Sequence, residues 1–349
     1  MTTITRRGTL QLMSAAGAGL FLPGMGGGLA AAQQGRSLDA QILGFTLAIH
    51  VPAIVALNDG MVELGYGPSE MARIESMQVV TQSIVSGSAE VGEADIISAM
   101  RAAGAGADVK LTGLVYNNTS QVLVVDADRV SSLADLANPA NPIALSSTGD
   151  FIYVMLAGAM ARENVSIDDV TTVEIGGSGS RMRALLGGRV AGVPVHFDQA
   201  QQIMQEGNYK VLVEPWTIFD PWLSEAWLCN GRWLENADNE RMMIDLVKAT
   251  ITSFRRANES YDYFAEGYRK FSTAADAATV TDETLRPIWE QLSQTIRAWP
   301  DDGGFRREYF EQLLPEYRNA GVLSANLDIG SVVDTTYVER ALTELGPRP

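Results

Sequence analysis

The chain has 349 residues, of which 46% are hydrophobic, and its 42 acidic and 26 basic residues give a formal net charge of −16 at pH 7. This length allows two domains with substantial cores, and the acidic surface disfavours nucleic acid and anionic lipid as partners. One cysteine and two histidines exclude an intramolecular disulfide and a cysteine-based metal cluster, and they leave little material for a zinc site or a catalytic triad. We therefore expect no cofactor, no metal and no enzymatic activity.

The first 32 residues have the pattern of an export signal. Arg6 and Arg7 precede an uncharged apolar run over 10–22, and Ala30-Ala31-Ala32 supplies the small residues of a cleavage site. The paired arginines between threonines favour the twin-arginine route, which exports folded proteins. Because the apolar run is shorter than the roughly 20 residues that span a bilayer, we expect a cleaved signal peptide over 1–32. The mature protein would be periplasmic, without direct membrane insertion.

Short apolar runs then alternate with segments of helical periodicity. The pattern predicts a first βα unit with strands over 45–49, 74–80, 110–116 and 122–126, and with helices over 52–64, 82–86 and 96–103. A second unit predicts a capped turn over 131–136, strands over 142–146, 170–175, 190–195 and 210–213, and helices over 151–163, 181–186 and 199–205. The alternation indicates an α/β fold with mainly parallel sheets flanked by helices. Helices over 239–259, 260–270, 281–297 and 305–320 follow, with apolar stripes that suit packing on a lobe.

Several of these segments resemble the solute-binding proteins of ABC importers for nitrate, sulfonates, taurine and thiamine precursors. The resemblance rests on the Gly-Ser-Ala-Glu turn within 83–109, on 130–136, on the Ser/Thr/Gly-rich turn that ends 143–150, and on 175–192. It covers residues from about 40 to 320, although Ala191-Gly192 replaces the Asp-Ala that is usual in the family.

The resemblance implies a type II periplasmic binding protein fold of two α/β lobes joined by two crossings, with the C-terminal helices packing on lobe one. Lobe one would comprise 39–127 plus 216–349, and lobe two 128–215. It also implies that the protein, as a monomer, captures a small organic molecule in the interlobe cleft and delivers it to the membrane permease of an ABC importer.

The expected ligand residues follow from the sheets. Ligands of open α/β sheets bind beyond the carboxyl ends of the strands, near helix N-termini whose N–H groups suit an oxyanion or a carbonyl. The loops at these positions supply the candidates His50, Thr81, Gln82, Glu93, Asp95, Ser147, Thr148, Gly149, Asp150, Phe151, Ser178, His196, Phe197 and Asp198. A helix N-cap would equally explain 147–150, and a tight turn would explain 176–179.

Both histidines follow predicted strands, one in each lobe, so we expect His50 and His196 to approach the ligand from opposite sides. The nominated loops contain four acidic residues and no lysine, and Arg181 lies inside a predicted helix. A bare sulfonate or nitrate usually recruits arginine or lysine, so these acidic loops suit an amine or a heteroaromatic nitrogen at least as well. We therefore expect the ligand to be a sulfonate, or else a nitrogen-bearing small molecule or pyrimidine-like compound.

Two other functions share this fold. An enzyme would need a reactive histidine or a cofactor-carrying cysteine, and Cys229 falls on a predicted strand instead of a cleft loop. A receptor for another transporter type or for a sensor would have the same architecture, and the sequence does not separate it from an importer component.

Overall fold

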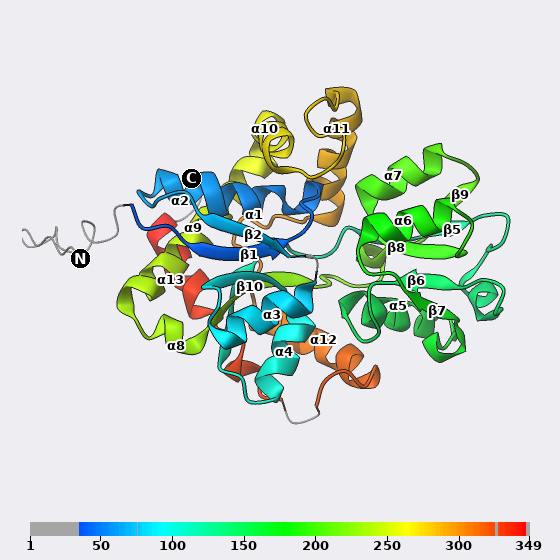
Figure 1. Ribbon diagram of the computed structural model, residues 1–349, viewed down its shortest axis with the longest axis horizontal. Helices are drawn as coiled ribbons and strands as arrows, with labels where there is room; N and C mark the ends of the chain where they lie inside the picture. Colours follow the sequence, from blue (N-terminus) through cyan, green and yellow to red (C-terminus); the bar gives the residue numbers. More distant parts are fainter. Residues whose placement is uncertain (1–34, 75, 325–326, 347–349) are drawn as a thin grey trace, which may run out of the picture.

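The computed structural model describes residues 35–74, 76–324 and 327–346, so the expected signal peptide over 1–32 lies outside the described residues. Two five-stranded sheets form two lobes that lie side by side along the long axis of the molecule (Figure 1). The strands in chain order are β1 (Asp39–Leu43), β2 (Glu70–Ile74), β3 (Val91–Asp95), β4 (Val109–Leu114), β5 (Gln121–Asp126), β6 (Ile143–Leu145), β7 (Thr172–Glu174), β8 (Gly192–His196), β9 (Tyr209–Val213) and β10 (Glu225–Asn230).

The two sheets have the same mixed topology. The first has the order β2-β1-β3-β10-β4, in which β1 pairs parallel with β2 and β3 while β10 runs antiparallel to β3 and β4. The second has the order β7-β6-β8-β5-β9, in which β6 pairs parallel with β7 and β8 while β5 runs antiparallel to β8 and β9. The expected two-lobed α/β architecture is confirmed, and each lobe contains one antiparallel strand that follows a crossing.

The predicted lobe boundary at residue 127 is wrong for one strand. β5 belongs to the second sheet, where it lies between β8 and β9, so the first crossing precedes β5 and runs over 115–120. The return crossing runs over 214–224 and leads into β10 of the first sheet. Apolar patterning identifies β4 and β5 as buried strands, but it carries no information about which sheet each strand joins.

Helices cover both sheets. They are α1 (Val51–Val55), α2 (Met61–Glu63), α3 (Met77–Ser86), α4 (Ile96–Gly104), α5 (Phe151–Arg162), α6 (Ser178–Leu186), α7 (Phe197–Gln205), α8 (Gly231–Leu234), α9 (Ala237–Glu259), α10 (Tyr261–Phe271), α11 (Asp282–Glu290), α12 (Arg307–Asn319) and α13 (Thr336–Leu345). Wider turns of π-helix over Ala56–Gly60 and Gln291–Ile296 join α1 to α2 and extend α11. No helix within the described ranges combines the length and the apolar character needed to cross a bilayer.

The C-terminal helices pack mainly on lobe one, as expected, with α9 against α1, β4 and α13. α12 also contacts α5 of the second lobe, and Arg162 pairs with Glu316 at 2.9 Å across that contact (Figure 1). The C-terminal segment therefore connects the two lobes as well as covering the first.

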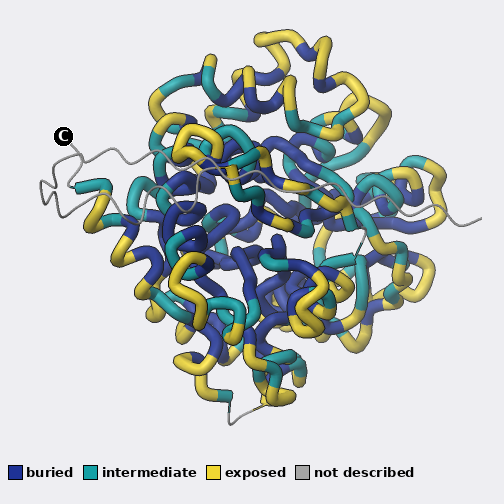
Figure 2. The backbone as a smooth tube through the Cα atoms, turned by 60° about the vertical axis from the view of Figure 1, so that its left-hand side comes forward, coloured by how far each residue is buried: buried dark blue, intermediate teal, exposed yellow. Residues whose placement is uncertain are grey.

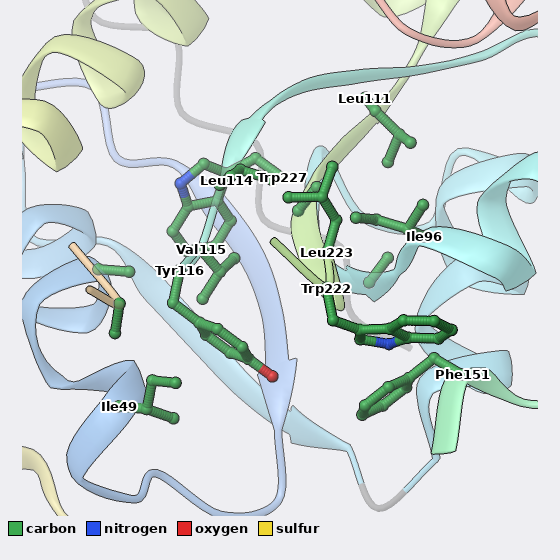
Figure 3. Close-up of a cluster of buried hydrophobic side chains, with 14 of the residues drawn as sticks. Ile49, Ile96, Leu111, Leu114, Val115, Tyr116, Phe151, Trp222, Leu223 and Trp227 are labelled. Atoms are coloured by element: carbon green, nitrogen blue, oxygen red, sulfur yellow. The ribbon is translucent and has the colours of Figure 1, made fainter. Parts of the chain in front are cut away.

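The larger hydrophobic core runs through the first lobe and the crossings into α5. Figure 2 shows the buried segments gathered in the interior of the molecule, with the exposed segments at its periphery. In β5, Leu123 and Val125 face this core, whereas Val122 and Val124 face a smaller core beneath α6 and α7. This alternation is the two-residue period of a strand buried on both faces. Trp222, Trp227, Tyr116 and Phe151 belong to one buried cluster, to which Phe151 contributes from α5 of the second lobe (Figure 3).

Two predicted strands are wrong. Residues 45–49 form a loop and a 3-10 turn that begins at Ala48, because β1 already ends at Leu43. The apolar run over 74–80 is divided between the end of β2 and the start of α3, since a short apolar run fits a strand and a buried helix equally well. β3 and α13 were not predicted; Gly92, Glu93 and Asp95 give β3 a composition that is poor in strand-forming residues.

Gly92 provides a test of how closely α3 packs on β3. A Cβ at this position would lie 2.6 Å from Cγ1 of Val80 and 3.1 Å from Cγ1 of Ile84, both on α3. We expect Gly92→Ala to lower the free energy of unfolding by about 1–3 kcal/mol, because the added methyl overpacks a close contact. Chemical denaturation measures the change. Gly104→Ala is the control, since the atom nearest to its added Cβ would be Cδ1 of Leu327 at 3.8 Å. An equal loss of stability in that variant would contradict the packing argument.

Candidate functional site

A cavity of about 170 Å³ lies between the lobes, at the carboxyl ends of the parallel strands. The first lobe contributes Leu43, Phe45, Ser76, Met77, Gln78, Asp95 and Ser98. The second contributes Gln121, Ser146, Ser147, Asp150, Phe151, Ile152, Gly176, Gly177, Ser178, Arg181 and His196. The volume is below the roughly 300–1,000 Å³ of sites for drug-sized ligands, which indicates a small ligand.

The predicted site residues divide into two groups. Those on the cavity wall are Asp95, Ser147, Asp150, Phe151, Ser178 and His196. Those away from it are His50, Thr81, Gln82, Glu93, Thr148, Gly149, Phe197 and Asp198. That the residues of the first group contact the ligand stays a prediction.

Thr81 and Gln82 were predicted in the loop after the second strand, and this placement is wrong. Both lie inside α3, where the Thr81 hydroxyl donates to the carbonyl of Met77. Because β2 ends at Ile74 and α3 begins at Met77, the loop at the cavity is an earlier segment that includes Ser76.

Three further candidates, Thr148, Gly149 and Phe197, do not line the cavity. The backbone N–H of Thr148, an exposed residue, donates to Glu174 at 2.7 Å, and Gly149 has a φ of +81°, which favours glycine in this turn. The Phe197 ring contacts Trp216 at 6.3 Å. These residues shape the loops that carry the cavity wall.

Asp95 is the first of two buried carboxylates in the wall. It is the N-cap of α4, and it accepts hydrogen bonds from the backbone N–H groups of Ile97 and Ser98 and from the Ser98 hydroxyl at 2.7 Å. Burial raises the pKa of Asp95 to about 7, against the opposing effect of these hydrogen bonds, and the charge of Asp150 raises it further.

Asp150 is the corresponding cap in the second lobe. It accepts the backbone N–H of Tyr153 at 2.9 Å at the start of α5, together with the hydroxyls of Ser146 and Ser147. Burial raises the pKa of Asp150, while the hydroxyl of Ser146 and the charge of Arg181 act in the opposite direction. A buried carboxylate from each lobe therefore lines the same cavity.

Arg181 corrects the expectation of a cleft without arginine. It lines the cavity with 2% of its surface exposed, one turn into α6. Its Nε donates to the carbonyl of Pro194 at 2.9 Å, and a second guanidinium nitrogen donates to the carbonyl of Gly176. Burial lowers the pKa of Arg181 to about 10, and the charge of Asp150 opposes this shift.

The floor of the cavity is aromatic. The ring of Phe45 lies 5.7 Å from that of His50 and 6.0 Å from that of His196, and the two imidazoles are 5.3 Å apart. The two lobes thus bring the histidines together, but only His196 lines the cavity. Nδ1 of His196 lies 2.8 Å from the Ser120 hydroxyl, and burial lowers the pKa of His196 well below its usual range, so its ring is neutral at pH 7.

His50 belongs to a buried cluster with Glu93 and Glu225 behind this floor. The ligand atoms of the three side chains all lie within 4.8 Å of one another. Burial raises the pKa of Glu93 to about 7, opposed by the charge of His50 and reinforced by that of Glu225. Burial lowers the pKa of His50, but the neighbouring Glu225, Glu93 and Asp198 raise it more strongly, so that the net shift is upward.

The tautomer of His50 disfavours metal binding at this cluster. Nδ1 accepts the backbone N–H of Leu47 at 3.1 Å, so a neutral ring carries its proton on Nε2, the nitrogen that lies 3.5 Å from Glu225. A metal-ligating histidine needs a lone pair on the ligating nitrogen and donates from the other one. The cluster therefore suits a pair in which the protonated Nε2 of His50 faces the carboxylate of Glu225, and not a bound metal ion.

The sequence reasoning missed several wall residues. Phe45 and Gln78 were assigned to strands that do not exist, and Arg181 was set aside because it lies within a helix. Gln121, which lines the wall, stands at the start of β5, and Glu225, which belongs to the buried cluster behind the floor, stands at the start of β10. A polar residue at the first position of an apolar strand was the available signal for both.

Comparison with known proteins supports the family prediction. A family model described as NMT1/THI5 like matches residues 72–256, which is more than half of the chain. No curated protein matches the sequence.

Solved structures share the fold at low sequence identity. The periplasmic nitrate-binding protein NrtA from Synechocystis PCC 6803 is similar with a TM-score of 0.72 and 13% identity, over 89% of this chain and 89% of that chain. A ligand-binding component of an ABC-type import system from Staphylococcus aureus, with zinc bound, has a TM-score of 0.70 and 11% identity, over 88% of this chain and 99% of that chain. A putative periplasmic sulfonate-binding protein SsuA from Methylobacillus flagellatus KT has a TM-score of 0.66 and 17% identity, over 89% of this chain and 96% of that chain.

Proposed function

We propose that this chain, which belongs to the NMT1/THI5-like family, is an extracytoplasmic solute-binding protein that delivers a small organic molecule to an ABC importer. The observation that carries the proposal is the interlobe cavity, whose polar side chains come from both lobes at the carboxyl ends of the strands. A ligand that contacts both walls favours the closed arrangement of the lobes over the open one, and it shifts the population in proportion to that difference in affinity.

Two ligand classes have support in the cavity wall. An anionic group such as a sulfonate would find Arg181 and the N-terminus of α6, where Gly177 is the N-cap and no side chain caps the helix. A nitrogen-bearing group would find the carboxylates of Asp95 and Asp150 beside the rings of Phe45 and Phe151. The two classes differ in charge, so binding experiments separate them.

The export, location and partner that we propose for this protein are those expected from its sequence. We propose that residues 1–32 direct export by the twin-arginine route, that the mature protein is periplasmic and monomeric, and that it docks on a membrane permease. The structural neighbours that are named as periplasmic or as ABC import components support this placement.

A direct test starts from the exported protein. We expect protein purified from a periplasmic extract to release a small molecule on denaturation, which mass spectrometry identifies. When it is added back to stripped protein, that molecule should raise the melting temperature, because binding only the folded state stabilises it by RT ln(1 + [L]/Kd). It should also reduce the radius of gyration measured by X-ray scattering. Chemical conversion of the molecule by the protein would contradict a transport function. So would a melting temperature that stays unchanged when the molecule is added at the concentrations found around the host cell.

A further inference from the structure

The charge of the cavity wall determines which of the two ligand classes is favoured. Four ionisable side chains line the cavity: Asp95, Asp150, Arg181 and His196. His196 is neutral because its pKa lies well below 6.5, so with both carboxylates ionised the wall has one more negative than positive charge. An unbalanced buried charge is costly unless a ligand or a proton neutralises it.

The single cation does not offset this excess at both carboxylates. Arg181 lies in the second lobe, donates to the carbonyls of Gly176 and Pro194, and acts electrostatically on Asp150. Asp95 lies on the first lobe. Its pKa is shifted by burial, by the hydrogen bonds that it accepts from Ile97 and Ser98, and by the negative charge of Asp150. The two carboxylates repel each other, each being carried by a different lobe.

One uncharged acceptor in the wall, the amide oxygen of Gln121, lacks a donor among the described residues. Gln121 is 2% exposed and lines the cavity, and its buried Oε1 has no hydrogen-bond partner among the described residues. Buried acceptors in native proteins are almost always satisfied, so an orphan at a cavity wall indicates a donor that arrives with the ligand. Phe45 and Phe151 supply aromatic surface at the same cavity, which favours a cation over an anion.

We propose that the ligand carries a protonated nitrogen with N–H donors, a primary ammonium or an amidinium, which bridges Asp95 of the first lobe and Asp150 of the second. This inference rests on the proposed function and specifies its ligand. The cation removes the repulsion between the two carboxylates, so it binds the closed arrangement more tightly than the open one. The proposal contrasts with the nitrate and sulfonate after which two structural neighbours are named.

Matched compounds on a three-carbon chain test the charge of the ligand. The probes are propylamine, butanamidine (a propyl chain carrying an amidinium), 3-aminopropane-1-sulfonate and 1-propanesulfonate, tested with stripped protein by thermal shift and calorimetry. We expect the nitrogen-bearing probes to bind and 1-propanesulfonate not to bind. Binding of 1-propanesulfonate without binding of any amine overturns the inference and leaves the solute-binding function intact. Failure of every nitrogen-bearing probe at millimolar concentration overturns the inference as well.

Substitutions in the wall test the bridge. Asp95→Asn and Asp150→Asn are each expected to weaken amine binding by about tenfold to a hundredfold, which is the loss of a charged hydrogen bond. Asp135→Asn is the matched control, because Asp135 also accepts hydrogen bonds from two serines, Ser131 and Ser132, but does not line the cavity. Equal affinities in all three variants would overturn the bridge, and thermal unfolding in the absence of ligand shows whether each variant is folded.

The pH profile supplies an independent readout. Because the carboxyl of Asp95 has a pKa of about 7, protonation at pH 5 removes the negative charge that attracts the amine. Amine affinity should therefore rise between pH 5 and pH 8, and the rise should be smaller in Asp95→Asn. An affinity that falls over this range, as expected for an anionic ligand, would overturn the proposal.

Discussion

Asp95→Asn is expected to increase the free energy of unfolding at pH 8 by about 1–2 kcal/mol, although it weakens ligand binding. In the folded protein the pKa of Asp95 is about 7, well above the 3.8 of an exposed aspartate. Between these two values the native state holds more protons than the unfolded state, so stability falls as the pH rises from about 4 to about 7. Asparagine has no charge to bury, and it remains one of the preferred N-cap residues.

Urea denaturation of wild type and variant at several pH values measures this effect. The wild type should lose stability from pH 5 to pH 8, and the variant should lose less; Glu93, whose pKa is also about 7, contributes a slope of the same sign to both proteins. Asp135→Asn is the control, because serine hydroxyl and backbone donors lower the pKa of Asp135 to about 2. Asp135 is therefore ionised in both the folded and the unfolded state from pH 5 to pH 8, and the pH profile of its variant should run parallel to that of the wild type. Parallel pH profiles for wild type and Asp95→Asn would contradict the buried charge at Asp95.

Trp222→Ala should cause the largest loss of stability, about 3–5 kcal/mol. Trp222 lies in the return crossing and is fully buried beside Phe151 of the second lobe (Figure 3). Its ring lies 4.5 Å from that of Phe219 and 5.9 Å from that of Tyr317. Removing the indole leaves a cavity at the junction that a well-packed core cannot fill. Differential scanning calorimetry should show a melting temperature lower by roughly 6–15 °C.

Two further variants separate packing from hydrogen bonding at this position. Trp216→Ala, six residues earlier and half-buried, should cost less than half as much. Trp222→Phe should retain most of the stability, because the buried Nε1 of Trp222 has no hydrogen-bond partner among the described residues. A loss in Trp222→Phe as large as that in Trp222→Ala would show that the indole nitrogen contributes, and would contradict the packing account.

The positions of Asp95 and Asp150 follow a common logic. Each caps the helix that follows a strand of its lobe: Asp95 is the last residue of β3, and Asp150 ends the short turn after β6. The residue that satisfies the helix N-terminus therefore also lines the cleft. The capping explanation and the ligand explanation are therefore compatible at these positions. Burying these two charges lowers the stability of the folded protein. Such a loss is expected at residues that are retained because binding depends on them.

The α/β alternation and the helix caps could be predicted from local sequence, because each is a short-range pattern of period or of hydrogen-bonding residues. Asp150 before Phe151 and Asp95 before Ile96 stand at cap positions that a reader of the sequence can identify. The two-lobed fold followed from the resemblance, and most helices begin and end within a few residues of their predicted bounds.

Only the tertiary structure decided which strands share a sheet and which polar side chains share a cavity. β10 brings Glu225 opposite Asp95, 130 residues away along the chain, and no local pattern encodes that pairing. Arg181 faces the cavity because α6 lies against β8, where the carbonyl of Pro194 holds its guanidinium, whereas the sequence alone placed it on a helix. The sequence therefore determined the chemistry available to the cleft, and long-range strand pairing determined its charge.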